Sequence, residues 1–581
     1  MEIGACKGEM TKKDLRKKER EEIDNPNVLL YSSHLPENKL IRVKAGKGSP
    51  RTIPDTFLGV FVEEINHACA GGLWAELVSN RVIGNESSIS VSINSTSCFE
   101  RNKAALNMEV HCGDHNPCPV GGVGVSNPGY WGMNIEEGKL YKVVYHVKSE
   151  GNVDFQLSFA GVDVIKVASN ITQVSGQNQW KRVETLLKAN ATNHSSSLQI
   201  TTTTNGIGPW EERPGHFNDI WNYWSEDGIG YFEYLQLAED LGALPIWVFN
   251  AGISRYEQIK TSNLAPYVQD ALDGIEFARG SSKSKWGSLR ARLGHPNPFD
   301  LRYVAVGNED CEFSNYQANY VTFHDAIRHA YPDIKIISNC DASNTPLNHS
   351  ADLFDFHIYT NSGDLFSKST QFEKTSRSGP KAFVSEYAVW REDAANGSLV
   401  AAVAEAAFLI GLEKNSDVVD MVSYAPLFSN INDRKWIPDA IVFNSYQLYG
   451  TPSYWVQKLF IESSGATYLN SSLLTTSSSN KLIASGISWQ NSTDKKNYLR
   501  IKVVNFGAAT EELNILIDGF PKEQKFGFTK TVLTSTNKMD ENSFSEPTKV
   551  VPQTSWVENV SKEINATLSP YSVTSFDLLI Y

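Results

Sequence analysis

Several polar side chains stand directly after apolar segments or alternate within them, at points where strands would end. They are Glu63 and Glu64 after FLGVFV, Asn308 and Glu309 after RYVAVG, His357 and Tyr359 in LFDFHIYT, and Glu386 after KAFVS. In a barrel of parallel strands, the carboxyl ends of the strands converge on the active site. These side chains are therefore the first candidates for chemistry.

The glutamates suit one reaction in particular. Two carboxylates from separate strands can face each other across a sugar, where one protonates the leaving oxygen and the other attacks the anomeric carbon or activates water. The acid needs a raised pKa while its partner stays ionised, and burial with mutual repulsion can arrange that. Carboxylates at strand ends also cap helices and pair with arginine, so residue type alone leaves a structural role open for each.

The elements that would position these residues follow Gly206. Helical segments such as DGIGYFEYLQLAEDLGA, APYVQDALDGIEFAR and LVAAVAEAAFLIGLEKN alternate with strand segments such as LPIWVFNAG, LRYVAVGNE and KAFVSEYAVW. Repeated helix and strand units of this spacing predict a parallel sheet with crossover helices. Their number favours a (β/α)8-type barrel over an open sheet.

The segments before, within and after this barrel form further domains, so the predicted fold is multidomain, of α/β plus all-β type. We predict a charged disordered tail over 1–28, N-terminal strands and the first barrel strand over 29–81, an inserted β-sandwich over 82–205, the catalytic barrel over 206–455 and a C-terminal β-sandwich over 456–581. In the inserted module, Tyr130, Trp131 and Trp180 suit stacking on sugar rings, and a core role is equally compatible with their type.

Composition limits the partners of the chain. The 581 residues carry a net charge of −13, which disfavours nucleic acid and an anionic membrane surface because a polyanion would be repelled at long range. No run of eighteen apolar residues occurs, so no membrane-spanning helix is expected. A neutral or weakly charged substrate fits the chain better.

Signals for the cellular compartment point in two directions. The first 27 residues are charged and lack the apolar core of a signal peptide. Eleven N-x-S/T sequons, in contrast, favour a secretory origin. The seven cysteines leave open both a disulfide among Cys98, Cys112 and Cys118 and a role as small buried thiols, and their spacings match no zinc site.

Long motifs in order along the chain resemble plant α-L-arabinofuranosidases of glycoside hydrolase family 51. They include EEINHACAGGLWAELVSNR, GPWEERPGHF, AVGNEDC, DFHIYT, FVSEYAVW, NDRKWIPDAIVFNS and YGTPSYWVQKLF, and they extend over 54–460. The segment NPGYWGMNIEEGKLYKVVYHVKS is similar to the carbohydrate-binding-like module inserted in those enzymes. The resemblance implies an extracellular, exo-acting, retaining enzyme that trims arabinose-containing polysaccharide. We expect no cofactor, because two-carboxylate chemistry needs none, and no metal, because the sequence shows no metal-binding cluster.

The resemblance also implies roles for individual residues. Glu309 in GNEDC matches the general acid/base and Glu386 in VSEYAVW matches the nucleophile, so hydrolysis would proceed by double displacement. The other matched positions would bind the sugar or orient the nucleophile. They are Glu63, Asn308, His357, Tyr359, Trp390, Trp436 and Gln447. A core role stays open for His357, and a packing role for the two tryptophans.

One departure from the family pattern stands before GPWEERPG. The family has a helix there and then a strand with a glycine-rich end, whereas here TTTTNGIG runs straight into the motif. We therefore predict a barrel without its second strand, and so with two unpaired edges. Two alternatives to an arabinofuranosidase stay open. One is a β-xylosidase or bifunctional retaining glycosidase on the same barrel, because fold and paired glutamates do not fix the sugar. The other, which the missing strand motivates, is an inactive polysaccharide-binding relic. The sequence indicates no oligomeric state.

Overall fold

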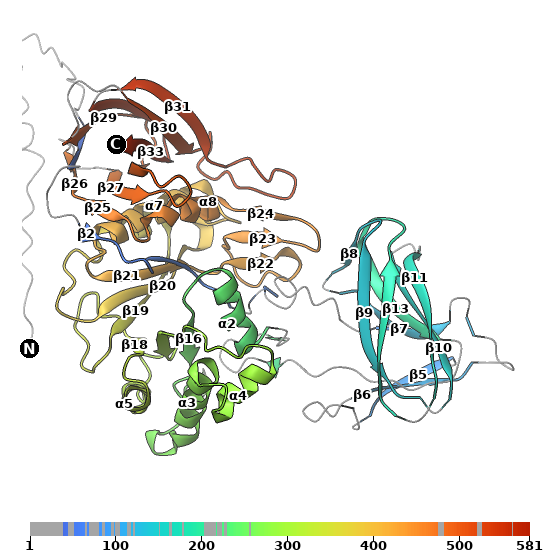
Figure 1. Ribbon diagram of the computed structural model, residues 1–581. Helices are drawn as coiled ribbons and strands as arrows, with labels where there is room; N and C mark the ends of the chain where they lie inside the picture. The colour runs from blue at the N-terminus through green and yellow to red at the C-terminus, as the bar shows by residue number, and fades with distance from the viewer. Residues whose placement is uncertain are drawn as a thin grey trace, which may run out of the picture.

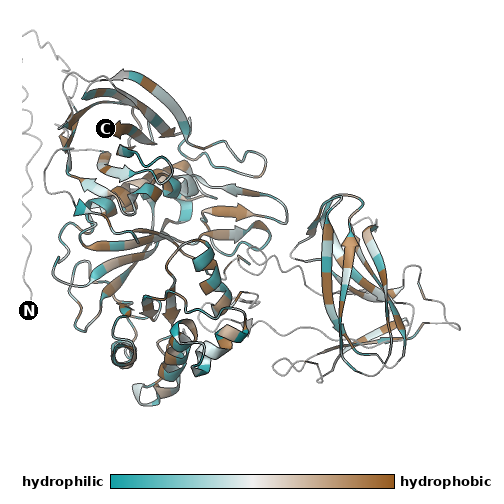
Figure 2. Ribbon diagram, viewed as in Figure 1, coloured by the Kyte–Doolittle hydropathy of each residue, from teal (hydrophilic) through white to brown (hydrophobic). Residues whose placement is uncertain are grey.

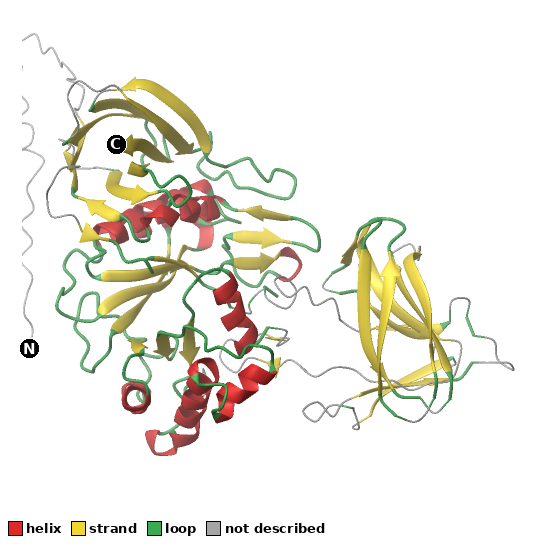
Figure 3. Ribbon diagram, in the orientation of Figure 1, coloured by secondary structure: helices red, strands yellow, loops and turns green. Residues whose placement is uncertain are grey.

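The chain contains three structural units, of which only the middle one is rich in helices (Figures 1 and 3). The computed structural model describes residues 39–580 except 45–50, 64, 66, 69–80, 84–87, 95–97, 99–104, 113–117, 120–121, 130, 150, 162–165, 177–178, 203–215, 218–223, 226–228, 255–256, 475–480, 520–525 and 561. The tail expected at 1–28 and the candidates Glu64 and Tyr130 lie outside the described residues.

The middle unit is built on a curled sheet of seven strands. Their order is β16 (Ile246–Phe249), β17 (Tyr303–Val306), β18 (Lys335–Ser338), β19 (Leu353–Thr360), β20 (Lys381–Val389), β21 (Val419–Tyr424) and β3 (Leu58–Val60). Every neighbouring pair is parallel, so the carboxyl ends of all seven strands lie on one side. The predicted parallel sheet is confirmed, and its strand β3 comes from the N-terminal part of the chain.

Helices connect and cover these strands. They are α2 (Tyr231–Asp240), α3 (Ala265–Arg279), α4 (Lys285–Arg292), α5 (Tyr316–Ala330), α6 (Ser362–Ser367), α7 (Leu399–Lys414) and α8 (Pro452–Leu459), with short 3-10 turns η2 (Thr261–Asn263), η3 (Lys368–Thr370), η4 (Arg391–Asp393), η5 (Ile431–Asp433) and η6 (Ile461–Ser463). Helix α7 is buried over its whole length except its last residue, because it lies between the barrel sheet and the C-terminal unit (Figure 1). This position explains why its sequence has no polar stripe.

Further short strands belong to the middle unit. They are β22 (Phe428–Asn430), β23 (Ile441–Phe443) and β24 (Leu448–Gly450), which form a three-stranded sheet, and the pair β14 (His216–Phe217) and β15 (Trp224–Ser225). The turn between β23 and β24 carries residues 444–447 toward the inserted unit (Figure 1).

The barrel sheet has two end strands, β3 and β16, and each pairs with one neighbour within the described part of the chain. Val60 on β3 is 55% exposed and Val248 on β16 is 46% exposed. The strands between them are mostly buried. Exposed valines at these two edges fit the expected lack of a second barrel strand, which would lie between them. Because 203–215 and 218–223 are not described, the lack stays a prediction.

The inserted unit consists of strands around a core of its own. They are β4 (Arg81–Ile83), β5 (Ile89–Asn94), β6 (Ala105–Val110), β7 (Val123–Asn127), β8 (Met133–Ile135), β9 (Leu140–Val147), β10 (Val153–Ala160), β11 (Lys166–Val174), β12 (Lys181–Lys188) and β13 (Asn193–Thr202). Hydrophobic and hydrophilic residues alternate along them, as strands with one buried face require (Figure 2). The sequence left open whether its cysteines form a disulfide or are buried thiols. The structure contains a disulfide between Cys112 and Cys118.

The C-terminal unit contains two sheets. One has the order β2 (Arg51–Thr52), β25 (Thr467–Leu469), β27 (Leu482–Gln490), β28 (Asn497–Asn505), β33 (Ser572–Ile580), β30 (Phe526–Leu533) and β31 (Gln553–Val560), and the other has β26 (Ser471–Leu474), β1 (Lys39–Lys44), β29 (Glu511–Asp518) and β32 (Glu563–Leu568). Strands β1 and β2 come from the N-terminal segment, so that segment is shared between the barrel and the C-terminal unit.

A buried ion pair joins the barrel to the C-terminal unit. Lys502 on β28 donates to Glu413 on α7, and both side chains are fully buried. Ser463 accepts from the same ammonium at 2.9 Å, and Ser485 donates to the second carboxylate oxygen at 2.5 Å. Burial lowers the pKa of Lys502, against the opposing pull of the Glu413 charge. Each charge is therefore tolerated only because the other is present.

Lys502→Met should destabilise the chain by about 3–5 kcal/mol, because it leaves the Glu413 carboxylate buried without its partner. The double variant Lys502→Met/Glu413→Leu should regain most of that loss, since it removes both charges together. Urea unfolding of the full chain, followed by tryptophan fluorescence, measures both. Equal destabilisation by the single and the double variant would contradict this role of the pair.

Candidate active site

A tight turn after β17 presents Glu309. Gly307 has φ 85°, and a Cβ at this position would lie 2.6 Å from the ring of Tyr316, so only glycine fits without a shift. Glu309 itself has φ 55°, in the left-handed region that costs a non-glycine residue about 1–3 kcal/mol. The carboxylate of Asp310 holds the turn by accepting a hydrogen bond from the backbone N–H of Asn308 at 3.1 Å.

A disulfide fixes the base of this turn. Cys311 after β17 is bonded to Cys340 after β18, with their Cα atoms 5.1 Å apart. Beside it, the backbone N–H of Asp310 donates to the side-chain oxygen of Asn339 at 2.6 Å. The loops that follow two neighbouring strands are thus held together directly next to Glu309.

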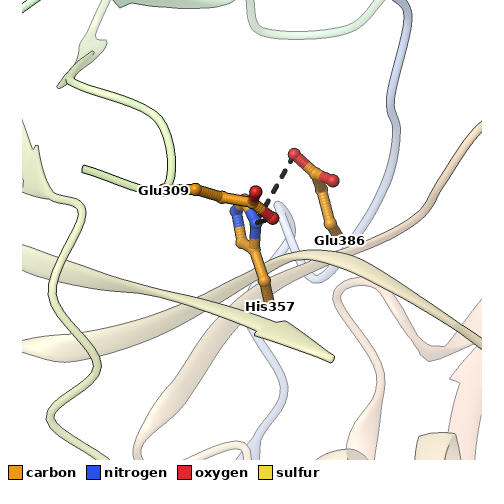
Figure 4. Close-up of side chains that lie close together, drawn as sticks. All are labelled: Glu309, His357 and Glu386. Carbon is orange, nitrogen blue, oxygen red and sulfur yellow. Dashed lines mark hydrogen bonds and ion pairs between the residues drawn. The ribbon is translucent and has the colours of Figure 1, made fainter. Parts of the chain in front are cut away.

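Strand β19 presents three polar side chains at alternating positions, as the two-residue period of a strand requires. His357 lies among three acidic groups: Nε2 is 3.0 Å from Asp355, and Nδ1 is 3.1 Å from Glu309 and 3.6 Å from Glu386. Tyr359 donates its hydroxyl proton to Glu386 at 2.7 Å. Figure 4 shows Glu309, His357 and Glu386 pointing toward one another from three separate segments.

His357 carries a positive charge at neutral pH. Burial alone would lower the pKa of His357, but the charge of Asp355 and hydrogen bonds to Asp355 and Glu309 raise it to about 11, with a contribution from Glu386. The ring is therefore an imidazolium that donates from both nitrogens. Two glutamates and a histidine are also ligand types for zinc.

Glu386 is buried at the carboxyl-terminal part of β20, and its side chain is 9% exposed. Burial raises the pKa of Glu386 to about 7, while the charge of His357 and the hydrogen bond from Tyr359 oppose that rise. The charge of Glu63, which follows the β3 segment, also raises this pKa. The carboxylates of Glu309 and Glu386 and the ring of His357 each offer an atom within 4.8 Å of the others.

Aromatic side chains form a wall beside this cluster. Trp390, directly after β20, stacks on Trp436 with ring centroids 5.2 Å apart and planes 11° from parallel. Trp436 meets Tyr359 edge-on at 5.1 Å, so the wall continues to the group that holds Glu386. The guanidinium of Arg391 lies 4.8 Å from the Trp390 ring centroid. Sugar rings pack well on such surfaces because their C–H faces are apolar.

The structure places the sequence candidates as follows. Glu309, His357, Tyr359 and Glu386 lie in one cluster, with Trp390 and Trp436 beside it. Glu63 is near enough for its charge to act on Glu386, and Asn308 is half-buried in the turn that carries Glu309. Gln447 is exposed in the turn between β23 and β24, where its backbone N–H bonds the side chain of Asn444.

Two groups in the cluster were missed in the sequence. Asp355 accepts from His357, and Ser385 donates to Asp355 at 2.5 Å and bonds the His357 ring at 2.9 Å. Asp355 could have been found from strand alternation, because it stands two residues before His357. Ser385 could not, since neighbours on a regular strand face opposite sides. An extra residue in β20 between Phe383 and Glu386 breaks that alternation and lets Ser385 join the cluster.

Two carboxylates at the ends of parallel strands, beside an aromatic wall, define the class of barrel-type glycoside hydrolases. Two family models match the chain, the alpha-L-arabinofuranosidase 1 domain over 194–377 and the alpha-L-arabinofuranosidase C-terminal domain over 385–572. The chain belongs to the α-L-arabinofuranosidases of glycoside hydrolase family 51.

Similar proteins and solved structures support this family assignment. Alpha-L-arabinofuranosidases 1 and 2 of Arabidopsis thaliana are each 52% identical to this chain, over 93% of it and 91% of the relative. The structure of an arabinose-bound MgGH51 α-L-arabinofuranosidase is 25% identical with a TM-score of 0.82, over 93% of this chain and all of that one. The enzyme from Thermotoga maritima, 19% identical with a TM-score of 0.52 over 64% of this chain and 82% of its own, shares the fold.

The match to the first Arabidopsis relative is 619 residues long, longer than this chain of 581 residues. The relative therefore contains internal residues that have no counterpart here. This difference fits the expected lack of a helix and a strand before GPWEERPG.

Asp355→Asn should lower the pKa of His357 from about 11, because the charge of Asp355 is the largest of the effects that raise it and burial then dominates. Nuclear magnetic resonance of ring-labelled histidine, followed over pH 5–11, measures the shift. The remaining histidines serve as internal controls. An unchanged His357 titration in the variant would contradict the charge assignment.

Proposed function

We propose that the chain is a retaining, exo-acting α-L-arabinofuranosidase that removes terminal arabinofuranosyl side chains from plant cell-wall polysaccharides. One observation carries the stereochemical part: oxygens of Glu309 and Glu386 lie within 4.8 Å of each other. Retaining glycosidases have carboxyl groups about 5–5.5 Å apart, whereas inverting ones leave about 6.5–9.5 Å for a water molecule. The spacing supports direct attack by one carboxylate.

Glu386 is the nucleophile and Glu309 the general acid/base in this proposal. Glu386 attacks the anomeric carbon while Glu309 protonates the leaving oxygen, which gives a covalent arabinosyl intermediate. Glu309 then takes a proton from water, whose oxygen displaces Glu386 and restores the original configuration. The exposures support this division, because Glu386 is buried and fixed by Tyr359 while the Glu309 side chain is 41% exposed, toward leaving group and water.

Other residues bind the sugar in this proposal. Glu63 and Asn308 bond sugar hydroxyls, and Trp390 with Trp436 provides the stacking wall. His357 offsets the repulsion between the carboxylates, and Tyr359 keeps Glu386 aimed at the anomeric carbon. Gln447 belongs to the rim of the pocket, since the turn that carries it is exposed.

We also propose that the chain acts outside the cell. A relative from Streptomyces chartreusis that is 29% identical, over 78% of this chain and 64% of its own length, is named an extracellular exo-alpha-L-arabinofuranosidase. Two disulfides among the described residues, together with the eleven sequons, suit an oxidising, secretory route. No helix among the described residues is long and apolar enough to cross a membrane.

A second candidate function is polysaccharide binding without turnover. It is motivated by the predicted lack of a second strand between β3 and β16, because a barrel without that strand would leave the wall of the sugar pocket incomplete. Binding to arabinoxylan with no release of arabinose, unchanged in Glu386→Ala, would support this candidate. Cleavage of nitrophenyl β-xyloside in place of the arabinofuranoside would instead indicate the xylosidase.

The wild-type chain should release arabinose from arabinoxylan, and Glu386→Ala should abolish release because no nucleophile remains. Glu309→Ala should lower kcat/KM about 10²–10⁴-fold on alkyl arabinofuranosides, which need a proton on the leaving oxygen. The loss should be far smaller on a dinitrophenyl arabinofuranoside, whose leaving group needs no proton. Reducing-sugar and absorbance assays measure these rates, and equal losses on both substrates would contradict the acid role.

Tyr359→Phe should move the acidic limb of the kcat/KM profile to higher pH. Glu386 must be ionised to attack, so kcat/KM falls as the pH drops through its pKa of about 7. The Tyr359 hydrogen bond lowers that pKa, and its loss raises it. Tyr267→Phe, at an exposed position on α3, is the matched control. A limb that stays in place or moves to lower pH would contradict the assignment of Glu386.

A further inference from the structure

The inserted unit touches the barrel through an aromatic side chain. Trp131, in the turn between β7 and β8, meets His67 of the barrel edge-on, with ring centroids 5.4 Å apart and planes at 89°. Trp131 is nevertheless 47% exposed. Both residues have left-handed backbones, with φ 64° and 50°. Two strained non-glycine residues in contact across two units indicate a local arrangement that the surrounding structure maintains.

A second contact lies between the same two units. His194, at the start of β13, stacks on Tyr446 in the turn between β23 and β24, with centroids 4.0 Å apart and planes 9° from parallel. Ser445 donates to the backbone oxygen of His194 at 3.0 Å. Tyr446 remains 46% exposed. The two contacts hold one end of the inserted unit against the loops of the barrel (Figure 1).

The first contact is continuous with the catalytic cluster. His67 pairs with Asp433 at 2.9 Å, and Asp433 ends η5, three residues before Trp436. Trp436 belongs to the aromatic wall beside Tyr359, which holds Glu386. Trp131 is thus linked to Asp433 through side-chain contacts, and the short backbone segment after Asp433 leads on to Trp436.

The charged side chains next to the contact between Trp131 and His67 pair with one another. Asp433 pairs with His67 and with Lys435, the latter at 2.7 Å. Exposed aromatic faces beside paired charges suit an uncharged ligand with apolar C–H faces, which is the chemistry of a neutral sugar chain.

We propose that Trp131 and Tyr446 form an extended subsite, contributed jointly by the inserted unit and the barrel, for the main chain of a neutral polysaccharide. The inference rests on the proposed function: the arabinofuranosyl side chain occupies the pocket while the sugar rings that bear it stack on Trp131 and Tyr446. The inserted unit therefore takes part in substrate selection at the active site and does more than anchor the enzyme to a polymer. An exo-acting enzyme with this surface prefers substituted polymers to small arabinosides.

The test compares a polymer with a small substrate. For each variant we would measure kcat/KM on soluble arabinoxylan, on branched arabinan and on p-nitrophenyl arabinofuranoside, which has no main chain. Trp131→Ala and Tyr446→Ala should each lower the ratio of polymer to nitrophenyl activity roughly five- to ten-fold on at least one polymer, chiefly through KM, as loss of a stacked ring predicts. Trp131→Phe should restore most of the ratio. Trp556→Ala, at a 62% exposed position in the C-terminal unit, is the matched control.

The outcomes separate this inference from the proposed function. An unchanged ratio in Trp131→Ala and Tyr446→Ala overturns the subsite. A lower ratio found only where small-angle scattering shows a detached unit also overturns it, because the rings then serve docking alone. If the wild-type chain hydrolyses no nitrophenyl arabinofuranoside, the proposed function fails. The subsite is then tested by the retardation of the protein in arabinoxylan-containing gels. It is supported if Trp131→Ala removes the retardation and overturned if it does not.

Discussion

The arrangement of the active site depends on one cation, the imidazolium of His357. Glu309 and Glu386 offer oxygens within 4.8 Å of each other, a distance at which two carboxylates repel strongly in a partly buried site. His357 lies within 3.1 Å of one and 3.6 Å of the other, and Asp355 on its far side keeps it protonated. Asp355 acts on the chemistry through His357, since its bonds go to His357, Ser385 and Asn339.

The backbone provides the rigidity that this charge arrangement needs. His357 and Glu386 are direct neighbours in the β19–β20 pairing, so their separation is set by the ladder itself. Glu309 comes from β17 and reaches the same point through a strained turn that a disulfide and Asp310 hold. Helix α7 is buried except for its last residue, and the Lys502 and Glu413 pair fixes it against the C-terminal unit. The C-terminal unit thus supports the sheet through α7.

Sequence patterns located the strand ends and hence most of the cluster, because buried parallel strands are continuous apolar runs and their ends are abrupt. Features that depend on tertiary contacts could not be predicted from such patterns. The extra residue in β20 that admits Ser385 leaves no mark in hydrophobic periodicity. Cys311 and Cys340 are far from each other in sequence, and their pairing follows only from the adjacency of β17 and β18.

Contacts between separate units could not be predicted from the sequence either. Strand β1 reads as an isolated alternating segment, yet it pairs in parallel with β29, more than 400 residues away in the chain. Trp131 matched sugar-stacking chemistry and core packing equally well in the sequence. Its 47% exposure and its contact with His67 exclude core packing, because a core tryptophan would be enclosed.

The end strands of the described sheet contribute unequally to the parts of the site. Glu309, His357 and Glu386 come from β17, β19 and β20, each paired with a strand on both sides. Glu63 follows β3, whose single partner among the described strands is β21, and its position is therefore less restrained. The groups proposed for bond cleavage thus lie in the part of the sheet that depends least on a second strand, whereas Glu63, which is proposed to hold the sugar, follows an end strand. A missing strand should accordingly weaken substrate binding more than the chemical step.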